Sequence, residues 1–455
     1  MVRSVPAIRR APLTFLERLV ARYGDLVAFP MPRGAVLLVN DPVAARQVLQ
    51  DNHRNYSKQT VQYSSLATVT GSGLLTADGE AWRIRRRIVQ PAFHHSSLDG
   101  VAEQASLAGR RLRSRWEAAP GQLLDADEAT LRAMLEVVGH TLFGSDRFDA
   151  DLAAVGERIV GAVDDALAVV VRQAQTLLPA SWPGPARRRL RRAVQVLDSG
   201  CADVVRARRE RGPAGGGASA DLGEPNDTDV LGLLLRAADA GELTDREVRD
   251  ELVTLVIAGH ETVASALTWA LHLLAEHPHW QQQLAVELDQ VLAGREPGWA
   301  DLPRLPLTRA VVDEALRLYP PAWVITRRAI GPDTLAGVQL PAGTLVILSP
   351  WLLHRRPDSW PDPLRFDPGR FVDSGRSAPR GDYIPFGAGP RLCIGRDFAL
   401  VEAVLVLATL LQGRRVARPA GAAPVQVDAL VTLRPRGGLP LHLTPSGGER
   451  GGQEG

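Results

Sequence analysis

The sequence predicts a mainly α-helical protein with small β-sheets, and three observations lead to this fold class. Apolar residues recur every three or four positions over 80–208, 229–292 and 307–318, as in helices with one buried face. Short runs rich in β-branched residues, bounded by proline and glycine, lie near both ends of the chain. No change of composition divides the 455 residues, which predicts a single domain over 1–455.

The N-terminal elements are a predicted helix and two predicted strands. Residues 12–23 have helical spacing, and the β-type runs 26–29 and 35–40 are joined by a turn that contains proline and glycine. Asp41 and Pro42 follow directly, and an aspartate before a proline is a common start of a helix. We therefore expect a second helix from Pro42.

The remaining elements alternate with segments of low helical propensity. Residues 210–228 are rich in glycine, proline, alanine and aspartate, which predicts a mobile surface loop. A short strand is expected at 344–348, a proline-rich coil at 357–385 and a closing hairpin at 425–443. The last residues, 446–455, are expected to form a disordered tail.

Composition limits the classes of function. Cys201 and Cys393 are far apart and cannot form a disulfide framework, which fits a reducing cytoplasm. Residues 1–22 contain no apolar stretch near the ~20 residues that span a bilayer, so we expect a soluble protein without a transmembrane anchor. A net charge of +2 gives no reason to expect nucleic-acid binding.

The segment Phe386–Gly395, FGAGPRLCIG, places one cysteine between a glycine-rich loop and an apolar helix. Backbone N–H groups at a tight turn and at a helix N-terminus stabilise a thiolate, and glycine allows close approach of the backbone to a flat ligand. Cys393 is therefore a candidate metal ligand. The alternative is a buried cysteine that fills the core, which is the commoner fate of an isolated cysteine.

A second segment, Ala258–Thr262, interrupts an apolar helix with Gly-His-Glu-Thr. Glycine in a helix costs ~1 kcal/mol relative to alanine, and the Thr262 hydroxyl can bond the Ala258 carbonyl and open the helix locally. We expect a polar notch in a buried helix. The alternative is a helix exposed on one side, with His-Glu-Thr as its wet face.

These segments together resemble the cytochrome P450 family. With Phe386 and Arg391 at their places, the cysteine loop resembles the family's haem-binding signature, and Ala258–Thr262 resembles its oxygen-activation motif. The likeness covers essentially the whole chain. It implies a triangular helical prism with haem b between a long distal helix and the helix after the cysteine loop.

The resemblance assigns roles to individual residues. Cys393 would be the axial ligand of the haem iron, Thr262 would act in dioxygen activation and Glu261 in proton relay. Glu314, Arg317 and Arg370 would form a buried ionic triad that braces the cysteine loop; by spacing alone, Glu314 and Arg317 could equally be a solvated pair. Gly369 departs from the acid usual beside the last arginine.

The haem-binding set implied by the resemblance extends beyond the cysteine. Trp82 and Arg86 share a helix face and would reach a haem propionate, whereas Arg85 is expected to point into solvent. Arg83, Arg87 and Arg396 would form a basic proximal patch for an acidic electron donor. The full cofactor-binding set is Cys393, Trp82, Arg86, Arg391, Arg327, Phe386 and Gly395.

The implied chemistry is monooxygenation of a lipophilic substrate by dioxygen. Electrons would come from NAD(P)H through a separate ferredoxin and ferredoxin reductase. Three stretches, Ala258–Trp269, Glu314–Trp323 and Arg391–Leu400, look like bacterial members that hydroxylate carotenoid rings. The candidate pocket residues are Gln62, Tyr63, Leu255, Ala258, Val324, Ile325 and Thr432.

Several alternatives stay open at this point. Related bacterial members act on fatty acids or terpenoids, so carotenoid hydroxylation is the leading substrate hypothesis among three. A peroxide-driven or isomerising enzyme, a haem-thiolate protein that binds a ligand without turnover, and a haem-free helical scaffold are the other readings. A cytoplasmic protein is expected, with peripheral contact to a membrane as a route to a lipophilic substrate.

Overall fold

The computed structural model describes residues 11–31, 34–143, 155, 158–159, 161–163, 165–170, 184–211, 229–372 and 381–446. The loop predicted at 210–228 and the tail predicted at 446–455 lie outside these residues, apart from 210–211 and 446.

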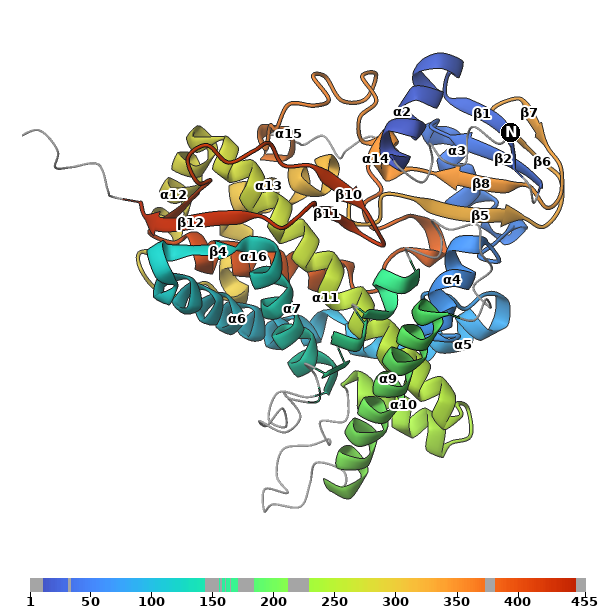
Figure 1. Ribbon diagram of the computed structural model, residues 1–455, viewed down its shortest axis with the longest axis horizontal. Helices are drawn as coiled ribbons and strands as arrows, with labels where there is room; N and C mark the ends of the chain where they lie inside the picture. The colour runs from blue at the N-terminus through green and yellow to red at the C-terminus, as the bar shows by residue number, and fades with distance from the viewer. Residues whose placement is uncertain are drawn as a thin grey trace, which may run out of the picture.

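Helices dominate the structure, as expected (Figure 1). The helices are α2 (Pro12–Tyr23), α3 (Pro42–Arg46), α4 (Val61–Thr70), α5 (Gly79–Val89), α6 (Leu98–Ala118), α7 (Ala126–Phe143), α9 (Pro185–Arg211), α10 (Val230–Asp239), α11 (Asp245–Glu276), α12 (Pro278–Leu292), α13 (Pro306–Leu318), α14 (Pro350–Leu353), α15 (Gly369–Val372) and α16 (Arg396–Leu411). Short 3-10 or π turns lie at Gln47–Asp51, His53–Asn55, Gln90–Phe93, His95–Ser97, Pro120–Gln122, Trp299–Arg304 and Gly389–Arg391.

The strands form small sheets. They are β1 (Leu26–Met31), β2 (Gly34–Val39), β3 (Tyr56–Ser57), β4 (Leu123–Asp125), β5 (Ile325–Ala329), β6 (Asp333–Leu335), β7 (Val338–Leu340), β8 (Leu345–Leu348), β9 (Arg414–Ala417), β10 (Val427–Ala429), β11 (Leu433–Pro435) and β12 (Pro440–Pro445). The largest sheet has the order β1-β2-β8-β5-β3. Its parallel pair joins β2 to β8, with Val36 opposite Leu345, so the N-terminal hairpin meets strands from far along the chain.

The expected N-terminal elements are confirmed. The predicted helix at 12–23 is α2, the two predicted strands pair as β1 and β2, and Asp41 begins α3. The Asp41 side chain accepts a hydrogen bond from the Ala44 N–H at 2.7 Å, as in a helix cap. The expected closing hairpin is present as β10 and β11, which pair antiparallel, but the last strand, β12, pairs with β4 and β9 instead.

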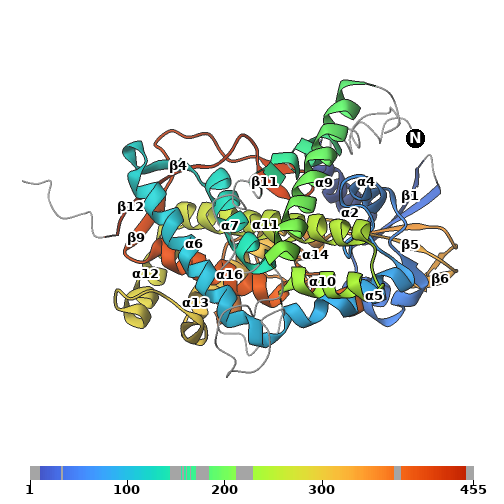
Figure 2. The same ribbon diagram turned by 90° about the horizontal axis from the view of Figure 1, so that it is seen from below.

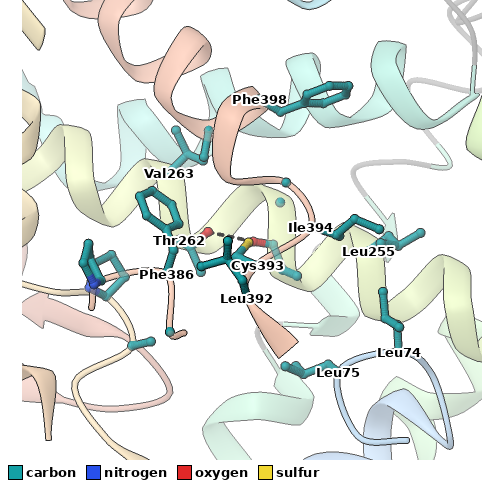
Figure 3. A pocket seen from close by; sticks show the side chains of 18 of the residues that line it. Leu74, Leu75, Leu255, Thr262, Val263, Phe386, Leu392, Cys393, Ile394 and Phe398 are labelled. Carbon is teal, nitrogen blue, oxygen red and sulfur yellow. Dashed lines mark hydrogen bonds between the residues drawn. The ribbon is translucent and has the colours of Figure 1, made fainter. Parts of the chain in front are cut away.

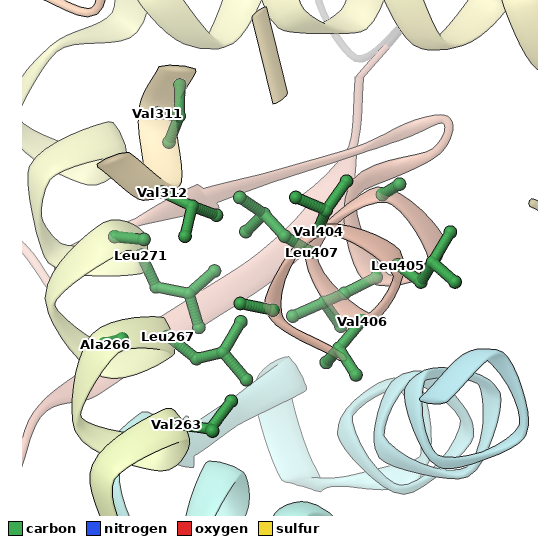
Figure 4. Close-up of a cluster of buried hydrophobic side chains, with 14 of the residues drawn as sticks. Val263, Ala266, Leu267, Leu271, Val311, Val312, Val404, Leu405, Val406 and Leu407 are labelled. Atoms are coloured by element: carbon green, nitrogen blue, oxygen red, sulfur yellow. The ribbon is translucent and has the colours of Figure 1, made fainter. Parts of the chain in front are cut away.

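Helix α11 is the central element of the fold. A capping box between Thr244 and Glu247 starts this 32-residue helix. It is long and apolar enough to cross a membrane, but 83% of its most apolar window is buried inside the protein, as in the core helix of a soluble protein. Figure 4 shows its side chains Val263, Ala266, Leu267 and Leu271 packed toward α13 and α16.

The sheet and the helical part occupy different sides of the molecule. In both views α6, α12 and α16 lie on the side away from β1 and β5, and α11 runs between the two parts (Figures 1 and 2). One face of α11 therefore packs in the helical core, while its middle borders the interior space described next.

Candidate functional site

The cysteine loop is built by backbone conformation. Gly387 and Gly389 have φ of 73° and 70°, where glycine is favoured, and a Cβ on Gly389 would collide with the Leu49 carbonyl oxygen. The Cys393 N–H donates to the Phe386 carbonyl at 3.0 Å, which closes the loop. The loop thus presents one thiol directly before α16.

The thiol faces an internal cavity of ≈ 320 Å³ (Figure 3). Cys393 and Phe386 line one side, and Ala258, Gly259 and Thr262 of α11 line the other. Cys393 is exposed to this cavity, because its side chain is part of the lining. Burial raises the pKa of the thiol, whereas the Gly395 N–H and the Arg86 charge favour the thiolate.

The α11 side of the cavity partly matches expectation. The Thr262 hydroxyl donates to the Ala258 carbonyl at 2.7 Å, as predicted. The helix does not open there, because it remains α-helical through the whole segment, so the predicted break is wrong. Gly259 has a packing reason: a Cβ there would lie 2.9 Å from Val138 Cγ2 of α7. The alternative of an exposed wet face is also wrong, since His260 and Glu261 are buried.

Glu261 is not among the residues that line the cavity, and its side chain contacts the loop between β10 and β11. The Thr432 hydroxyl donates to Glu261 Oε1 at 2.8 Å. Beside this contact the Leu433 carbonyl accepts hydrogen bonds from Ser265 and Trp269 of α11. In the structure Glu261 therefore links α11 to the C-terminal hairpin. Its role in proton relay stays a prediction.

Four cationic side chains line one end of the cavity. They are Lys58, Arg86, Arg327 and Arg391, and Trp82 lies beside them. Asp78 is the carboxylate that the described residues bring to this group, in an ion pair with Arg391. Burial and the Arg327 charge hold the pKa of Lys58 well below its ordinary value. Such an excess of buried positive charge is costly without an anionic ligand.

Lys58 was missed by sequence analysis. Its ammonium donates to the Leu75 carbonyl at 2.8 Å and lies 5.1 Å from the centre of the Tyr63 ring. The available signal was that it is the single lysine of an arginine-rich chain. Arg86 donates to the Leu392 carbonyl at 2.9 Å, and Arg391 lies 4.5 Å from the centre of the Trp82 ring.

The residues present fit a haem group. A thiol on one side, apolar walls and a cluster of buried cations at one end match an iron ligand, a flat macrocycle and its two carboxylates. The predicted cofactor-binding residues Cys393, Trp82, Arg86, Arg391, Arg327, Phe386 and Gly395 all line this cavity.

The predicted triad residues lie together in the core. Arg317 Nε lies 2.6 Å from Glu314 Oε2, and both side chains are fully buried. Arg370 Nε lies 3.5 Å from Glu314 Oε1. The solvated-pair alternative is therefore wrong. Arg317 also donates to the carbonyls of His354, Pro363 and Arg365, so it holds the coil that precedes the cysteine loop.

His354 is a further residue that sequence analysis missed. Its Nε2 accepts from the Ile384 N–H at 2.9 Å, so Nδ1 carries the proton and donates to the Arg317 carbonyl at 3.2 Å. Burial lowers the pKa of this imidazole to about 3, which keeps it neutral. His354 thereby connects the triad to the segment that leads into the cysteine loop.

The expectation for Arg85 is wrong. Its side chain is buried, donates to the Ser72 carbonyl at 2.6 Å and pairs with Glu247 and Glu251 at 3.1 and 3.3 Å. The reason is its place on the face of α5 that packs against the start of α11. By contrast, the exposed residues Arg83, Arg87 and Arg396 pair with Glu80, Glu242 and Asp397, and their role in docking a donor stays a prediction.

Some predicted pocket residues do not line the cavity. Tyr63, Leu255, Ala258 and Ile325 line it, as do Leu74 and Leu75, which were not predicted (Figure 3). Three others are absent from its lining: Gln62, Val324 and Thr432. Gln62 instead donates to the Val324 carbonyl at 3.3 Å and accepts from the Thr326 hydroxyl at 2.8 Å, so its amide joins α4 to β5.

Comparison with known proteins identifies relatives over almost the whole chain. The sequence model of the cytochrome P450 family matches residues 2–439. Cyclooctat-9-en-7-ol 5-monooxygenase of Streptomyces melanosporofaciens is 37% identical over 89% of this chain and 85% of that protein. Pentalenene oxygenase of Streptomyces avermitilis is 36% identical over 96% and 93%.

Two further relatives are a plant protein and a bacterial protein of known structure. The chloroplastic protein LUTEIN DEFICIENT 5 of Arabidopsis thaliana is 31% identical over 97% of this chain and 76% of that protein. The crystal structure of CYP175A1 from Thermus thermophilus has a TM-score of 0.75 and 31% identity, with 96% of each chain covered.

Proposed function

The chain belongs to the cytochrome P450 family of monooxygenases, and on this premise we propose that it hydroxylates a C–H bond of a lipophilic terpenoid. The observation that carries the proposal is the single cysteine thiol facing Thr262 across an apolar cavity with a cluster of cations at one end. An apolar cavity binds a substrate by burial of its hydrocarbon surface rather than by charge.

The residues of the cavity would hold and serve a haem b group. Cys393 would ligate its iron, and Lys58, Arg86, Arg327 and Arg391 would neutralise its two carboxylates. When bound, this group supplies the activation of dioxygen and the oxidation of the substrate. The apolar walls formed by Leu74, Leu75 and Leu255 would orient the hydrocarbon and exclude water.

Thr262 would hold a water molecule in the cavity and so take part in proton delivery. Its hydroxyl now donates to the Ala258 carbonyl, so its lone pairs can accept from a water in the cavity. We expect Thr262→Ala to lower the ratio of product formed to reductant consumed by about tenfold, and Thr262→Ser to keep it. Equal ratios in the parent and in Thr262→Ala would contradict this role.

The substrate class rests on the relatives. Two of them are named for cyclooctat-9-en-7-ol and pentalenene, which are terpenoids. Carotenoid ring hydroxylation is the second candidate, supported by the relative named for lutein and by the three sequence stretches that resemble carotenoid hydroxylases. Carotenoids are themselves long terpenoids, so the two candidates differ in length more than in chemistry.

We also propose a source of electrons and a cellular location, since a monooxygenase needs a reductant and access to its substrate. Electrons would reach the site from NAD(P)H through a ferredoxin and its reductase. The proposed place is the cytoplasm, with the membrane as the source of a lipophilic substrate.

The test is an optical titration of the ferric holoenzyme with pentalenene, β-carotene and palmitate, followed by turnover with a ferredoxin and its reductase. A saturable low-to-high-spin shift with pentalenene, and a hydroxylated product, would support the first candidate. A shift and product with β-carotene alone would favour the second. Palmitate as the only compound bound and oxidised would contradict both.

A further inference from the structure

The segment Gly71–Asp78 joins α4 to α5 and forms one wall of the cavity; we call it the strap. Its Leu74 and Leu75 side chains line the cavity, near Leu255 of α11 (Figure 3). A segment without secondary structure needs partners for its backbone groups. For the strap, the partners at one end are charged side chains buried in the protein.

Two carboxylates of α11 accept strap N–H groups. The Ser72 N–H donates to Asp250 Oδ2 at 2.8 Å, and the Leu74 N–H donates to Glu251 Oε2 at 3.1 Å. Asp250 and Glu251 are 4% and 0% exposed. Hydrogen bonds to an ionised carboxylate are stronger than neutral ones. Burial raises the pKa of Glu251 to about 7, while the Leu74 N–H and the Arg85 charge favour its ionised form. Leu74 is thus fixed at its own backbone.

Two arginines complete the arrangement. Arg85 donates to the Ser72 carbonyl at 2.6 Å and pairs with Glu251 at 3.3 Å. Arg249 pairs with Asp250 at 3.0 Å and donates to the Val69 carbonyl, just before the strap, at 2.9 Å. Arg85 with Glu251 and Arg249 with Asp250 thus form two buried pairs, and every member also binds the strap or Val69.

Two glycines allow the strap to lie against α11. A Cβ on Gly71 would collide with the Asp250 carboxylate, and a Cβ on Gly73 would collide with the Thr254 side chain. The other end of the strap is held separately, since Lys58 donates to the Leu75 carbonyl and Arg391 donates to the Ala77 carbonyl.

We propose that Arg85, Asp250 and Glu251 are positioning residues that set the size of substrate the enzyme accepts, by fixing Leu74 and Leu75 at the cavity wall. The role in substrate choice rests on the proposed function, because it requires that the substrate occupy this cavity. Buried ion pairs often add little net stability, because the loss of hydration offsets their attraction. Here these charges bind backbone atoms of the wall.

The first test measures the strap itself by amide hydrogen exchange of the holoenzyme. In Arg85→Gln we expect the Ser72 and Leu74 amides to exchange at least about tenfold faster than in the parent. The matched control is Arg83→Gln, the same change on the exposed face of the same helix. Parent-like exchange of both amides in Arg85→Gln would overturn the proposal. This readout is independent of the substrate.

A second variant covers the case in which Arg85→Gln fails to fold. Replacing both partners with apolar residues, as in Arg85→Met with Glu251→Leu, avoids a lone buried charge and often preserves stability. It still removes the acceptor of the Leu74 N–H. Faster exchange at the strap and parent-like exchange in α16 are expected; parent-like exchange at both places would overturn the proposal.

The third measurement tests size selection with probes that are not substrates. Optical titration of the holoenzyme uses imidazole as the small probe and 4-phenylimidazole as the large one. In the double variant we expect the Kd of imidazole to stay within about twofold and that of 4-phenylimidazole to change by about tenfold. Equal changes for both probes, or no change for either, would overturn the proposal, whatever the enzyme proves to oxidise.

Discussion

Lys58 is a buried basic side chain within a cluster of arginines. It lies among Arg86, Arg327 and Arg391, and the like charges together with burial disfavour its protonated form. An anionic ligand at this end of the cavity would reverse that balance. The effect of removing Lys58 should therefore change sign with the state of the site.

We predict that Lys58→Met stabilises the protein without haem and destabilises the protein with haem. The first effect comes from removing a buried basic group whose protonated form is disfavoured, and the second from losing a partner of a haem carboxylate. Thermal unfolding of both forms, with the parent alongside, measures the two shifts. A shift of the unfolding temperature in the same direction in both forms would show that Lys58 does not bind a haem carboxylate.

Glu402 of α16 is a buried carboxyl at the edge of the cavity, and burial raises its pKa from 4.5 to about 8. Between these values the folded protein retains a proton that the unfolded chain releases. The parent should therefore lose stability relative to Glu402→Gln by roughly 1.4 kcal/mol per pH unit over this range, and no more above pH 8.

Denaturant titrations of the parent and of Glu402→Gln at several pH values would measure this difference. Its expected signature is a slope that ends near the folded-state pKa. A stability difference that does not depend on pH would contradict the assignment of a proton to Glu402.

Helix α13 carries two arginines in different surroundings. Arg317 is fully buried beside Glu314, whereas the exposed Arg309 pairs with Asp313, a partly buried carboxylate on the same helix. Removal of one member of a buried pair leaves an uncompensated charge, at a cost of about 3–5 kcal/mol. Removal of an exposed arginine costs less, because water already screens its charge.

We therefore predict that Arg317→Ala yields little haem-loaded protein, while Arg309→Ala loads like the parent. The loss should be large because Arg317 also holds three carbonyls of the coil before the cysteine loop. Haem content per chain after purification is the measurement. Equal content in the two variants would mean that the triad does not brace the loop.

The elements of the site differ in how far sequence predicts them. The cysteine loop is local: glycines, a turn and a helix start occur within ten residues, so its form could be predicted. The bond from Thr262 to Ala258 is local too. Burial of Arg85 could not be predicted, because it depends on Glu251, which lies far along the chain. The direction of Glu261 likewise depends on Thr432 of a distant hairpin.

For the whole molecule, fold class and family were predictable, because several motifs occur in one order over the length of the chain. Which residues line the cavity was less predictable. Leu74 and Leu75 reach it only because the strap crosses from α4 to α5 along α11. No periodicity marks such a segment, and its glycines, Gly71 and Gly73, resemble those of any turn.

A single cooperative unit is proposed for the whole chain, and it can be tested. Helix α11 packs against α7, α13 and α16 in one hydrophobic core, so loss of one of these helices exposes the others. We predict one thermal transition, with loss of helix and loss of haem absorbance at the same temperature. Two separate transitions would indicate independently folding parts.

The cysteine loop and the strap border the same cavity but belong to different stretches of chain, and Arg391 of the loop contacts Ala77 and Asp78 at the far end of the strap from Leu74. Mutations can therefore change the strap and the cysteine loop independently in evolution. A mutation that exchanges Leu74 or Leu75 for a larger or smaller residue changes the shape offered to a hydrocarbon and leaves the thiol untouched. Substitutions at a few strap positions can therefore change which substrates a protein of this fold accepts, while the residues that serve the oxidation stay the same.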